Sequence, residues 1–155
     1  MATISISRHF DAPIERVWSL AMDLPRWPQW FPSILEVRDI SGPTDRVGTT
    51  ALLVAKGPDR VHQLRLELTR VEPPSIHGHA AAEVGGGMAY ESLIRLTPSG
   101  SGTDMLWQRD TSPTPGLLGG LVDRLLVVRM SERQMREACT GFQAMLDQQT
   151  PAEAG

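Results

Sequence analysis

Residues 11–34 read DAPIERVWSLAMDLPRWPQWFPSI, and this stretch decides how the rest of the chain can fold. Asp11 stands just before a proline that suits the first turn of a helix, so a short helix is predicted over residues 13–21, capped by Asp11. Prolines at positions 25 and 28 prevent a long continuation and predict a second, broken helical turn. This turn holds Trp27, Trp30 and Phe31, in a chain with only eight aromatic residues. The three rings either anchor the turn against the core or wall a cavity.

Period-two patterns on both sides of this stretch predict a sheet. Residues 4–10 alternate isoleucine with serine, as a half-buried strand does. Six further strands are predicted, separated by turn-forming sequences such as SGPTD and PSGSG. Their expected bounds are 35–40, 48–55, 60–72, 75–82, 88–97 and 103–110. Connections this short imply antiparallel pairing, because parallel crossovers need about a dozen residues or more.

The last part of the chain runs from residue 121 to 148 without a proline, which predicts one long helix. One strand, two short helices, six strands and a long helix is an α+β order, in which the long helix must cover one face of the sheet. We expect one domain over residues 1–148, followed by a flexible tail over residues 149–155.

Composition excludes several classes of protein. The net charge of −3 shows no clustered basic footprint for nucleic acid, and no apolar run is long enough for stable membrane insertion. Cys139 is the only cysteine, so an internal disulfide and a cysteine-based zinc site are excluded, and no metal or cofactor is expected. The N-terminus lacks a secretion pattern, so a cytoplasmic location is expected.

Four segments give the chain a family likeness: residues 11–34, TRVEPP at 69–74, SGSGTDMLWQ at 99–108, and the long final helix. In their order and spacing they resemble the START-like, or helix-grip, superfamily, which includes polyketide cyclase/dehydrase-type and lipid-transport proteins. The resemblance implies a curved seven-stranded antiparallel sheet wrapped around the C-terminal helix, with two short helices between strands 1 and 2. It also implies a deep apolar pocket between sheet and helix, but no particular reaction.

The strand over residues 60–72 indicates one wall of such a pocket. Simple alternation places Leu64, Leu66 and Arg70 on its buried face. Arg70 either extends outward into water from the strand end or offers its guanidinium to a ligand carbonyl, phenolate or carboxylate. The resemblance favours the second interpretation, because an arginine at the matching position contributes to the pocket of aromatase/cyclases.

The long helix and the last two strands would supply the other walls. An apolar helical stripe that includes Met135 and Cys139 is interrupted by Glu132, which leans into solvent, pairs with Arg129 or Arg136, or faces a polar ligand group. Met88, Tyr90, Trp107 and Arg109 lie on inward positions of the last two strands. Trp27 and Phe31 are expected on the cavity side, with Trp30 packed outside it or against the first helix. The predicted ligand-binding residues are Trp27, Phe31, Ile34, Leu64, Leu66, Arg70, Met88, Tyr90, Trp107, Glu132, Met135 and Cys139.

Two further motifs are interpreted as structural. His77 and His79 share a strand face, but no carboxylate or cysteine cluster accompanies them, so a metal site is not expected. Three glycines at 85–87 lie between strands, where they allow a bulge or a mobile flap rather than a phosphate loop.

Two functions fit these residues. The first is a carrier, sensor or sequestering protein for a polyketide-, polycyclic- or lipid-like molecule, which needs only apolar walls and a few polar anchors. The second is a cofactor-independent aromatase/cyclase, with Arg70 and Tyr90 as catalytic residues. The resemblance favours the binder, because Ile34 replaces a tyrosine of the cyclases, Leu64 and Leu66 replace tryptophans, and Ala80 replaces an arginine. We expect a monomer or a weak homodimer formed through Leu117, Leu118 and Val127.

Overall fold

The computed structural model describes residues 2–57, 60–112 and 121–154. Its elements follow the predicted order: β1 (Ala2–Phe10), α1 (Ile14–Met22), the 3-10 turn η1 (Leu24–Arg26), α2 (Trp27–Trp30), β2 (Ile34–Arg38), β3 (Thr50–Lys56), β4 (Val61–Glu72), β5 (Ile76–Glu83), β6 (Ala89–Ser99), β7 (Gly102–Ser112) and α3 (Leu121–Ala154). The strand bounds differ from the predicted ones by one or two residues at most ends.

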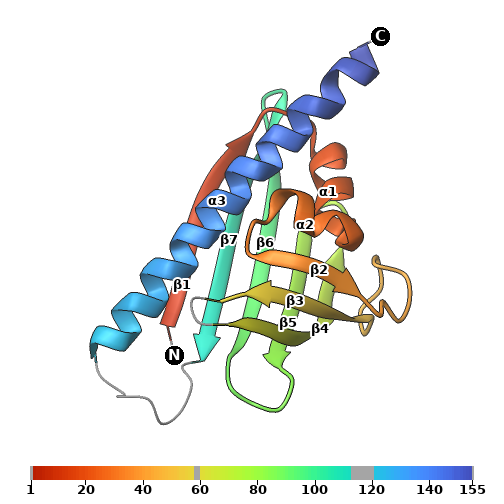
Figure 1. Cartoon of the computed structure of the whole chain (residues 1–155). Coiled ribbons are helices and arrows are strands. Elements are labelled where there is room, and N and C mark those ends of the chain that lie inside the picture. The colour runs from red at the N-terminus through yellow and green to blue at the C-terminus, as the bar shows by residue number, and fades with distance from the viewer. Residues whose placement is uncertain (1, 58–59, 113–120, 155) are drawn as a thin grey trace.

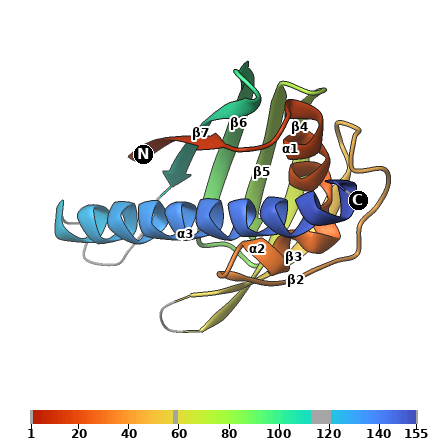
Figure 2. The ribbon, with the colours of Figure 1, turned by 90° about the horizontal axis from the view of Figure 1, so that it is seen from above.

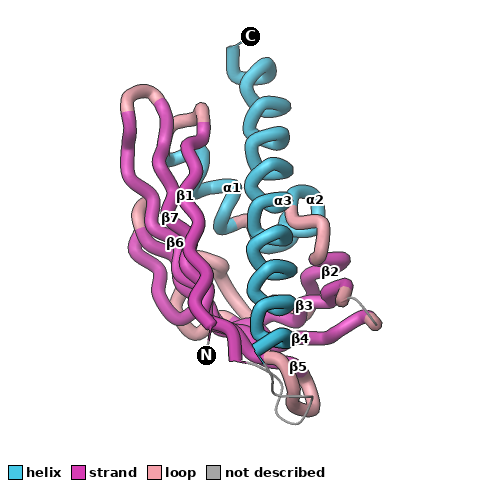
Figure 3. The backbone as a smooth tube through the Cα atoms, turned by 90° about the vertical axis from the view of Figure 1, so that its left-hand side faces the viewer, coloured by secondary structure: helices cyan, strands magenta, loops and turns pink. Residues whose placement is uncertain are grey.

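The seven strands form a single antiparallel sheet in the order β1-β7-β6-β5-β4-β3-β2. Strands β2 to β7 form a meander in which each strand pairs with the next one along the chain. The last strand, β7, also pairs with β1, so β1 and β2 are the two edge strands of the sheet. The sheet curves around α3, with β1 and β7 on one side of the helix and β2 and β3 on the other (Figures 1 and 3). The helix-grip arrangement predicted from the resemblance is confirmed.

The prolines act on the segment between β1 and β2 as predicted. α1 ends at Met22, and the chain continues through η1, which begins with Leu24 and Pro25, into the single turn of α2. The Trp27 indole donates to the Ala21 carbonyl at 2.9 Å and so fixes α2 beneath α1. The predicted Asp11 cap is wrong: Pro13 occupies the N-cap without any side-chain hydrogen bond. The Asp11 amide instead donates to the Gln143 side chain of α3 at 3.1 Å.

α3 packs mainly on β1 and α2 (Figure 2). Its inward-facing stripe runs from Val128, which is half-buried, to Met135, Cys139, Phe142 and Leu146, which are buried. Leu125, by contrast, is 50% exposed. The helix also runs to Ala154, beyond its predicted end, so flexibility of residues 149–155 stays a prediction. Leu117 and Leu118 lie outside the described residues, and none of the described helices has the length and apolar character to cross a membrane.

Two bulges bend the sheet, and both change which side chains point inward. Pairing shifts between Ile34 and Glu36 on β2 and between Leu68 and Arg70 on β4. Up to Leu68, every second residue of β4 is buried, as alternation predicts. After the bulge, Thr69 and Arg70 are both exposed, because the extra residue breaks the two-residue period.

Candidate functional site

Four polar side chains meet on the concave face of the sheet, and we call them the polar cluster: His77, His79, Tyr90 and Arg109. The histidines come from β5, the tyrosine from β6 and the arginine from β7, three adjacent strands whose register brings the four together. The ring centroids of the two histidines lie 5.2 Å apart, and the His79 ring lies 5.6 Å from the Tyr90 ring. The Arg109 Cζ atom lies 4.3 Å from the Tyr90 ring centroid. Tyr90 therefore links the histidines to the arginine.

Both histidines of the polar cluster are buried and neutral at physiological pH. Burial lowers the pKa of His77 to about 4. Burial also lowers the pKa of His79 well below its usual value, with smaller contributions from the charges of His77 and Arg109. All four imidazole nitrogens lack a hydrogen-bond partner within the described part of the chain. Buried polar atoms of this kind are rare in folded proteins and call for an explanation.

Arg109 is a buried charge that stands among rings instead of carboxylates. It is 6% exposed, and its Cζ atom lies 5.4 Å from the Trp107 ring centroid and 5.9 Å from that of Phe31, in addition to the Tyr90 contact. Its Nε has no hydrogen-bond partner among the described residues. Burial lowers the pKa of Arg109, but a guanidinium starts high enough to stay charged at neutral pH.

Cation–π contacts alone do not offset the burial of Arg109. Each such contact contributes about 0.5–2 kcal/mol, and the larger value needs close, desolvated geometry that only the Tyr90 contact approaches. Removing one ion from water costs several kcal/mol even after the protein relaxes. Burial of the Arg109 charge therefore lowers the stability of the free protein. Such a cost is typical of residues that have a functional role.

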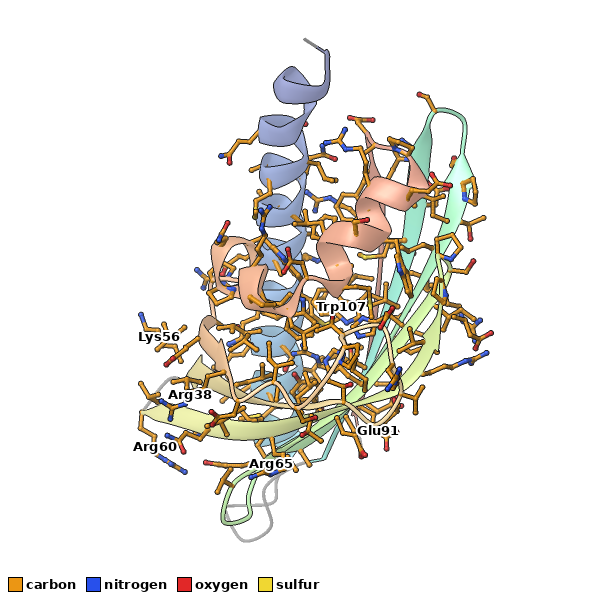
Figure 4. The ribbon with its side chains drawn as sticks, turned by 90° about the vertical axis from the view of Figure 1, so that its right-hand side faces the viewer. Arg38, Lys56, Arg60, Arg65, Glu91 and Trp107 are labelled. Atoms are coloured by element: carbon orange, nitrogen blue, oxygen red, sulfur yellow. The ribbon has the colours of Figure 1, made fainter. Side chains whose placement is uncertain are left out.

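Aromatic side chains surround the polar cluster on the helix side. The Trp27 ring lies 5.3 Å from the His79 ring, and the Phe31 ring packs edge-on against Trp107 at 5.7 Å. Trp30 packs edge-on against Phe142 of α3 at 5.0 Å. The Trp107 indole donates to the Ser92 hydroxyl at 2.6 Å, which fixes its orientation. Figure 4 shows Trp107 inside the curve of the sheet, whereas charged residues such as Arg38, Arg65 and Glu91 lie on the outside.

Among the described residues, the interior is nearly closed. A cavity of about 20 Å³ lies next to this aromatic wall, which is room for about one water molecule. Its lining residues are Phe10, Val17, Ala21, Trp30, Ile94, Leu96, Met105, Trp107, Cys139 and Phe142. Trp30 lines this cavity together with Val17 and Ala21 of α1, so of its two predicted positions the one outside the cavity is wrong. Cys139 is buried there, and burial raises the pKa of its thiol to about 11, as befits an apolar core residue.

Most of the predicted site residues point into the same interior. The buried ones come from α2, β2, β4, β7 and α3: Trp27, Phe31, Ile34, Leu64, Leu66, Trp107, Met135 and Cys139. Tyr90 and Met88 are half-buried. That these residues contact a ligand stays a prediction.

Two predicted site residues lie on the surface instead. The Arg70 side chain is 45% exposed and pairs with Glu72, because the β4 bulge turns it away from the buried face. The Glu132 side chain is 40% exposed and accepts from Arg136 at 2.8 Å, one helical turn away. Of the alternatives for these two residues, outward placement holds for Arg70 and pairing with an arginine holds for Glu132.

The polar residues that do point inward were only partly found from sequence. Alternation places Arg109 beside Trp107 on the inner face, but it cannot show that the arginine lacks a counter-ion. From sequence, His77 and His79 are interpreted as structural, and a metal site is the only function weighed for them. No group of three or more His, Cys, Asp or Glu able to hold a metal occurs in the part of the chain that the structure describes. The missed signal is two histidines at inward positions with apolar neighbours, since buried imidazoles need partners.

A second set of polar side chains lies beside the turn that connects β5 and β6. The His62 Nδ1 and the Arg60 guanidinium both lie 2.8 Å from one oxygen of Glu83. The other Glu83 oxygen accepts from the Met88 amide at 3.2 Å. The hydrogen bond with His62 and that from the Met88 amide hold the pKa of Glu83 below its usual value. Glycines 85–87, which all have positive φ, form the turn between Glu83 and Met88. The hydrogen bond from the Met88 amide to the Glu83 carboxylate therefore joins the two ends of this turn.

We expect Glu83→Gln to loosen the β5–β6 turn, because the amide keeps the shape of the carboxylate but loses its charge. The Met88 amide should exchange its hydrogen roughly tenfold faster, measured by NMR or mass spectrometry, because a charge-assisted bond is replaced by a neutral one. Glu91→Gln, an exposed glutamate on β6, is the control and should leave that rate unchanged. Equal rates in all three proteins would show that Glu83 does not hold the turn.

Residues 1–147 match the sequence profile of the family described as polyketide cyclase / dehydrase and lipid transport. A search of curated proteins found no match.

Solved structures with this fold come from several bacteria. A protein from Thermus thermophilus is 22% identical with a TM-score of 0.77, over 92% of this chain and 95% of that one. A conserved protein from Geobacillus kaustophilus is 17% identical with a TM-score of 0.78, over 95% and 96% of the two chains. A START superfamily protein from Mycobacterium smegmatis is 14% identical with a TM-score of 0.73, over 94% and 97%. At these identities the structures show the shared fold, and the profile match shows the family. The chain belongs to the family described as polyketide cyclase / dehydrase and lipid transport, and it has a helix-grip fold.

Proposed function

We propose that the protein binds an apolar small molecule, polyketide-, polycyclic- or lipid-like, between the sheet and α3, and serves as a carrier, sensor or sequestering protein. The observation that carries this proposal is the polar cluster: a buried guanidinium and two buried imidazoles with unpartnered nitrogens in an aromatic and aliphatic interior. A few polar groups in a largely apolar site are what small-molecule recognition needs. The family and the fold support the same conclusion.

The ligand would enlarge the interior as it binds. Sites for small molecules typically hold about 300–1,000 Å³, far more than the present cavity. Met105 and Met135 lie in the core near this cavity, and unbranched methionine side chains adapt readily to a new neighbour. The small cavity is therefore the place where we expect the interior to open around the ligand.

We also propose a location and an oligomeric state: the protein acts in the cytoplasm as a monomer or weak homodimer. Support for weak association comes from the first half of α3, where Leu125, Leu126, Val127 and Met130 are exposed. A cluster of this size is compatible with a transient contact.

The binding proposal is tested with the neutral fluorescent probe N-phenyl-1-naphthylamine. We expect saturable binding with energy transfer from the tryptophans, three of which are buried. Ala81→Leu adds volume on the inner face beside Leu66 and should weaken probe binding by roughly tenfold, because added methylenes overfill a packed site. Ala82→Leu, the exposed neighbour on the outer face, is the matched control. No energy transfer to folded protein, or equal weakening by both variants, would contradict an interior site.

A cyclase of the aromatase type is the second candidate, and the polar cluster is the observation that favours it. Arg109 and a histidine N–H could stabilise the negative charge that develops on an enolate oxygen during aldol closure. With Arg70 on the surface, Arg109 and Tyr90 become the candidate catalytic residues. Purified protein should then change the products of a reactive poly-β-ketone, and Arg109→Met or Tyr90→Phe should slow that change by ~10²-fold or more. An unchanged product profile with a wide set of polyketones would leave only the binding function.

A further inference from the structure

Arg109 places a permanent positive charge in the interior, and no carboxylate of the described residues pairs with it. The acids of its own strand, β7, and of the neighbouring β6 lie on the other face, and the other neighbour, β1, has none. Asp110 accepts from the Thr3 hydroxyl at 2.7 Å on the outer face, and its partner across the ladder, Glu91, is exposed. The residues paired with Arg109 itself are Ile4 on β1 and Ser92 on β6, neither of which carries charge. None of the ion pairs found among the described residues involves Arg109.

The other members of the polar cluster do not balance this charge. His77 and His79 are neutral, and burial raises the pKa of Tyr90, so its hydroxyl stays protonated although Arg109 opposes the shift. The cluster as a whole therefore carries one positive charge. Its neutral groups are suited to assist an anion, because each imidazole holds one N–H donor in addition to its acceptor nitrogen.

From this imbalance we propose that the natural ligand is a monoanion: an apolar body that carries one oxyanion group, such as a carboxylate or an acidic phenolate, bound against Arg109. This inference rests on the proposed binding function and narrows its ligand class. The oxyanion accepts from the guanidinium, and His79 lies close enough to the same Tyr90 ring to donate beside it. The tail extends toward Trp107, Phe142 and the small cavity.

A purely structural role for Arg109 would have different consequences for stability and ligand binding from a role in binding an anion. If the three rings were its intended partners, removing it would destabilise the free protein and would not distinguish a charged ligand from a neutral one. If the site is built for an anion, Arg109→Met removes an unpaired charge and should raise the melting temperature of the free protein while it lowers the affinity for anions. A substitution that raises the melting temperature and lowers the affinity is typical of functional residues that reduce the stability of the free protein.

The experiment compares two pairs of ligands at pH 7.5, by displacement of N-phenyl-1-naphthylamine. The members of a pair share the same apolar body and differ in the head group, which is an anionic carboxylate or a neutral alcohol. The pairs are dodecanoate with dodecanol, and 1-pyrenebutanoate with 1-pyrenebutanol. For at least one pair, we expect the wild-type protein to bind the anion roughly tenfold or more tightly than the alcohol, because a charge-assisted contact replaces a neutral one. Arg109→Met should abolish that preference and still bind the alcohol.

The matched control is Arg70→Met, which removes an arginine of the same chain at the exposed end of β4 and should keep the full preference. Arg109→Gln replaces Arg109→Met if the latter does not fold, and the wild-type comparison needs no variant. Equal affinity for acid and alcohol in both pairs, or a preference that survives loss of Arg109, would overturn the anion inference while binding itself stands. Failure of the probe and of all four compounds to bind would instead overturn the proposed function on which it rests.

Discussion

The protein should lose about 3 kcal/mol or more of its free energy of unfolding as the pH falls from 6.5 to 4, because His77 and His79 must stay neutral to remain buried. The pKa of His77 is about 4 in the folded chain and near its ordinary value of 6.5 in the unfolded chain. Between these values the unfolded state binds the proton and the folded state does not, so stability rises with pH across this window and is complete above it. His79 shifts in the same direction and adds to the loss.

Urea unfolding at half-unit intervals from pH 4 to 7.5 measures this effect. His77→Leu combined with His79→Leu should flatten the profile between pH 6.5 and 4.5, since leucine has no proton to gain. His9→Gln is the control, because His9 lies at the surface beside Asp104, and it should leave the loss unchanged. Glu83 and Asp104, whose pKa values are lowered chiefly by hydrogen bonds with their histidine partners, lose their contribution as the pH approaches their ordinary pKa values of 4.5 and 3.8, so they add to the loss at the acidic end of the range. A profile as steep in the double variant as in the wild type would show that other groups govern acid sensitivity.

The fold followed from the sequence because its signals are local and repeated. Prolines at 25 and 28 end α1 and force the turn of α2, and turn-forming sequences between the strands leave antiparallel pairing as the only short route. The long helix then has one face of one sheet to cover. Each of these conclusions depends on neighbours in sequence.

The candidate site was predicted less well from the sequence than the fold, because the site depends on contacts between residues that are distant in sequence. Arg70 lies at an inward position by counting, but one extra residue at the β4 bulge reverses it, and nothing in the strand's composition marks the bulge. Glu132 interrupts an apolar stripe in the sequence, yet the side chain pairs with Arg136 at the surface. Arg109 and the two histidines sit at inward positions by the same counting. Their significance appears only once β5, β6 and β7 are aligned. The one acid at an inward position of these three strands, Glu83 at the end of β5, is then seen to pair with His62 and Arg60 and not with Arg109.

Gly141→Ala should destabilise the protein by about 2 kcal/mol, although alanine is the better helix former. In an exposed helix this change would add about 1 kcal/mol of stability. At Gly141, α3 meets the backbone of α2 so closely that an added Cβ would lie 2.4 Å from the Trp30 carbonyl oxygen. That atom belongs to the backbone, so the helices must separate, and such overpacking costs about 1–3 kcal/mol or more.

The consequence of Gly141→Ala reaches the site because α2 carries Trp27 and Trp30. Moving α2 away from α3 should loosen Trp30 from Phe142 and Trp27 from His79, so the emission of the buried tryptophans should shift to longer wavelength. Ala144→Gly, an exposed position in the next turn of α3, measures the local helix propensity and should cost about 1 kcal/mol without the spectral shift. A stabilising Gly141→Ala would mean that α2 can move away freely. Helix contact would then not position the aromatic wall, and the Trp27 bond to Ala21 together with the packing of α2 on β2 would hold α2 in place.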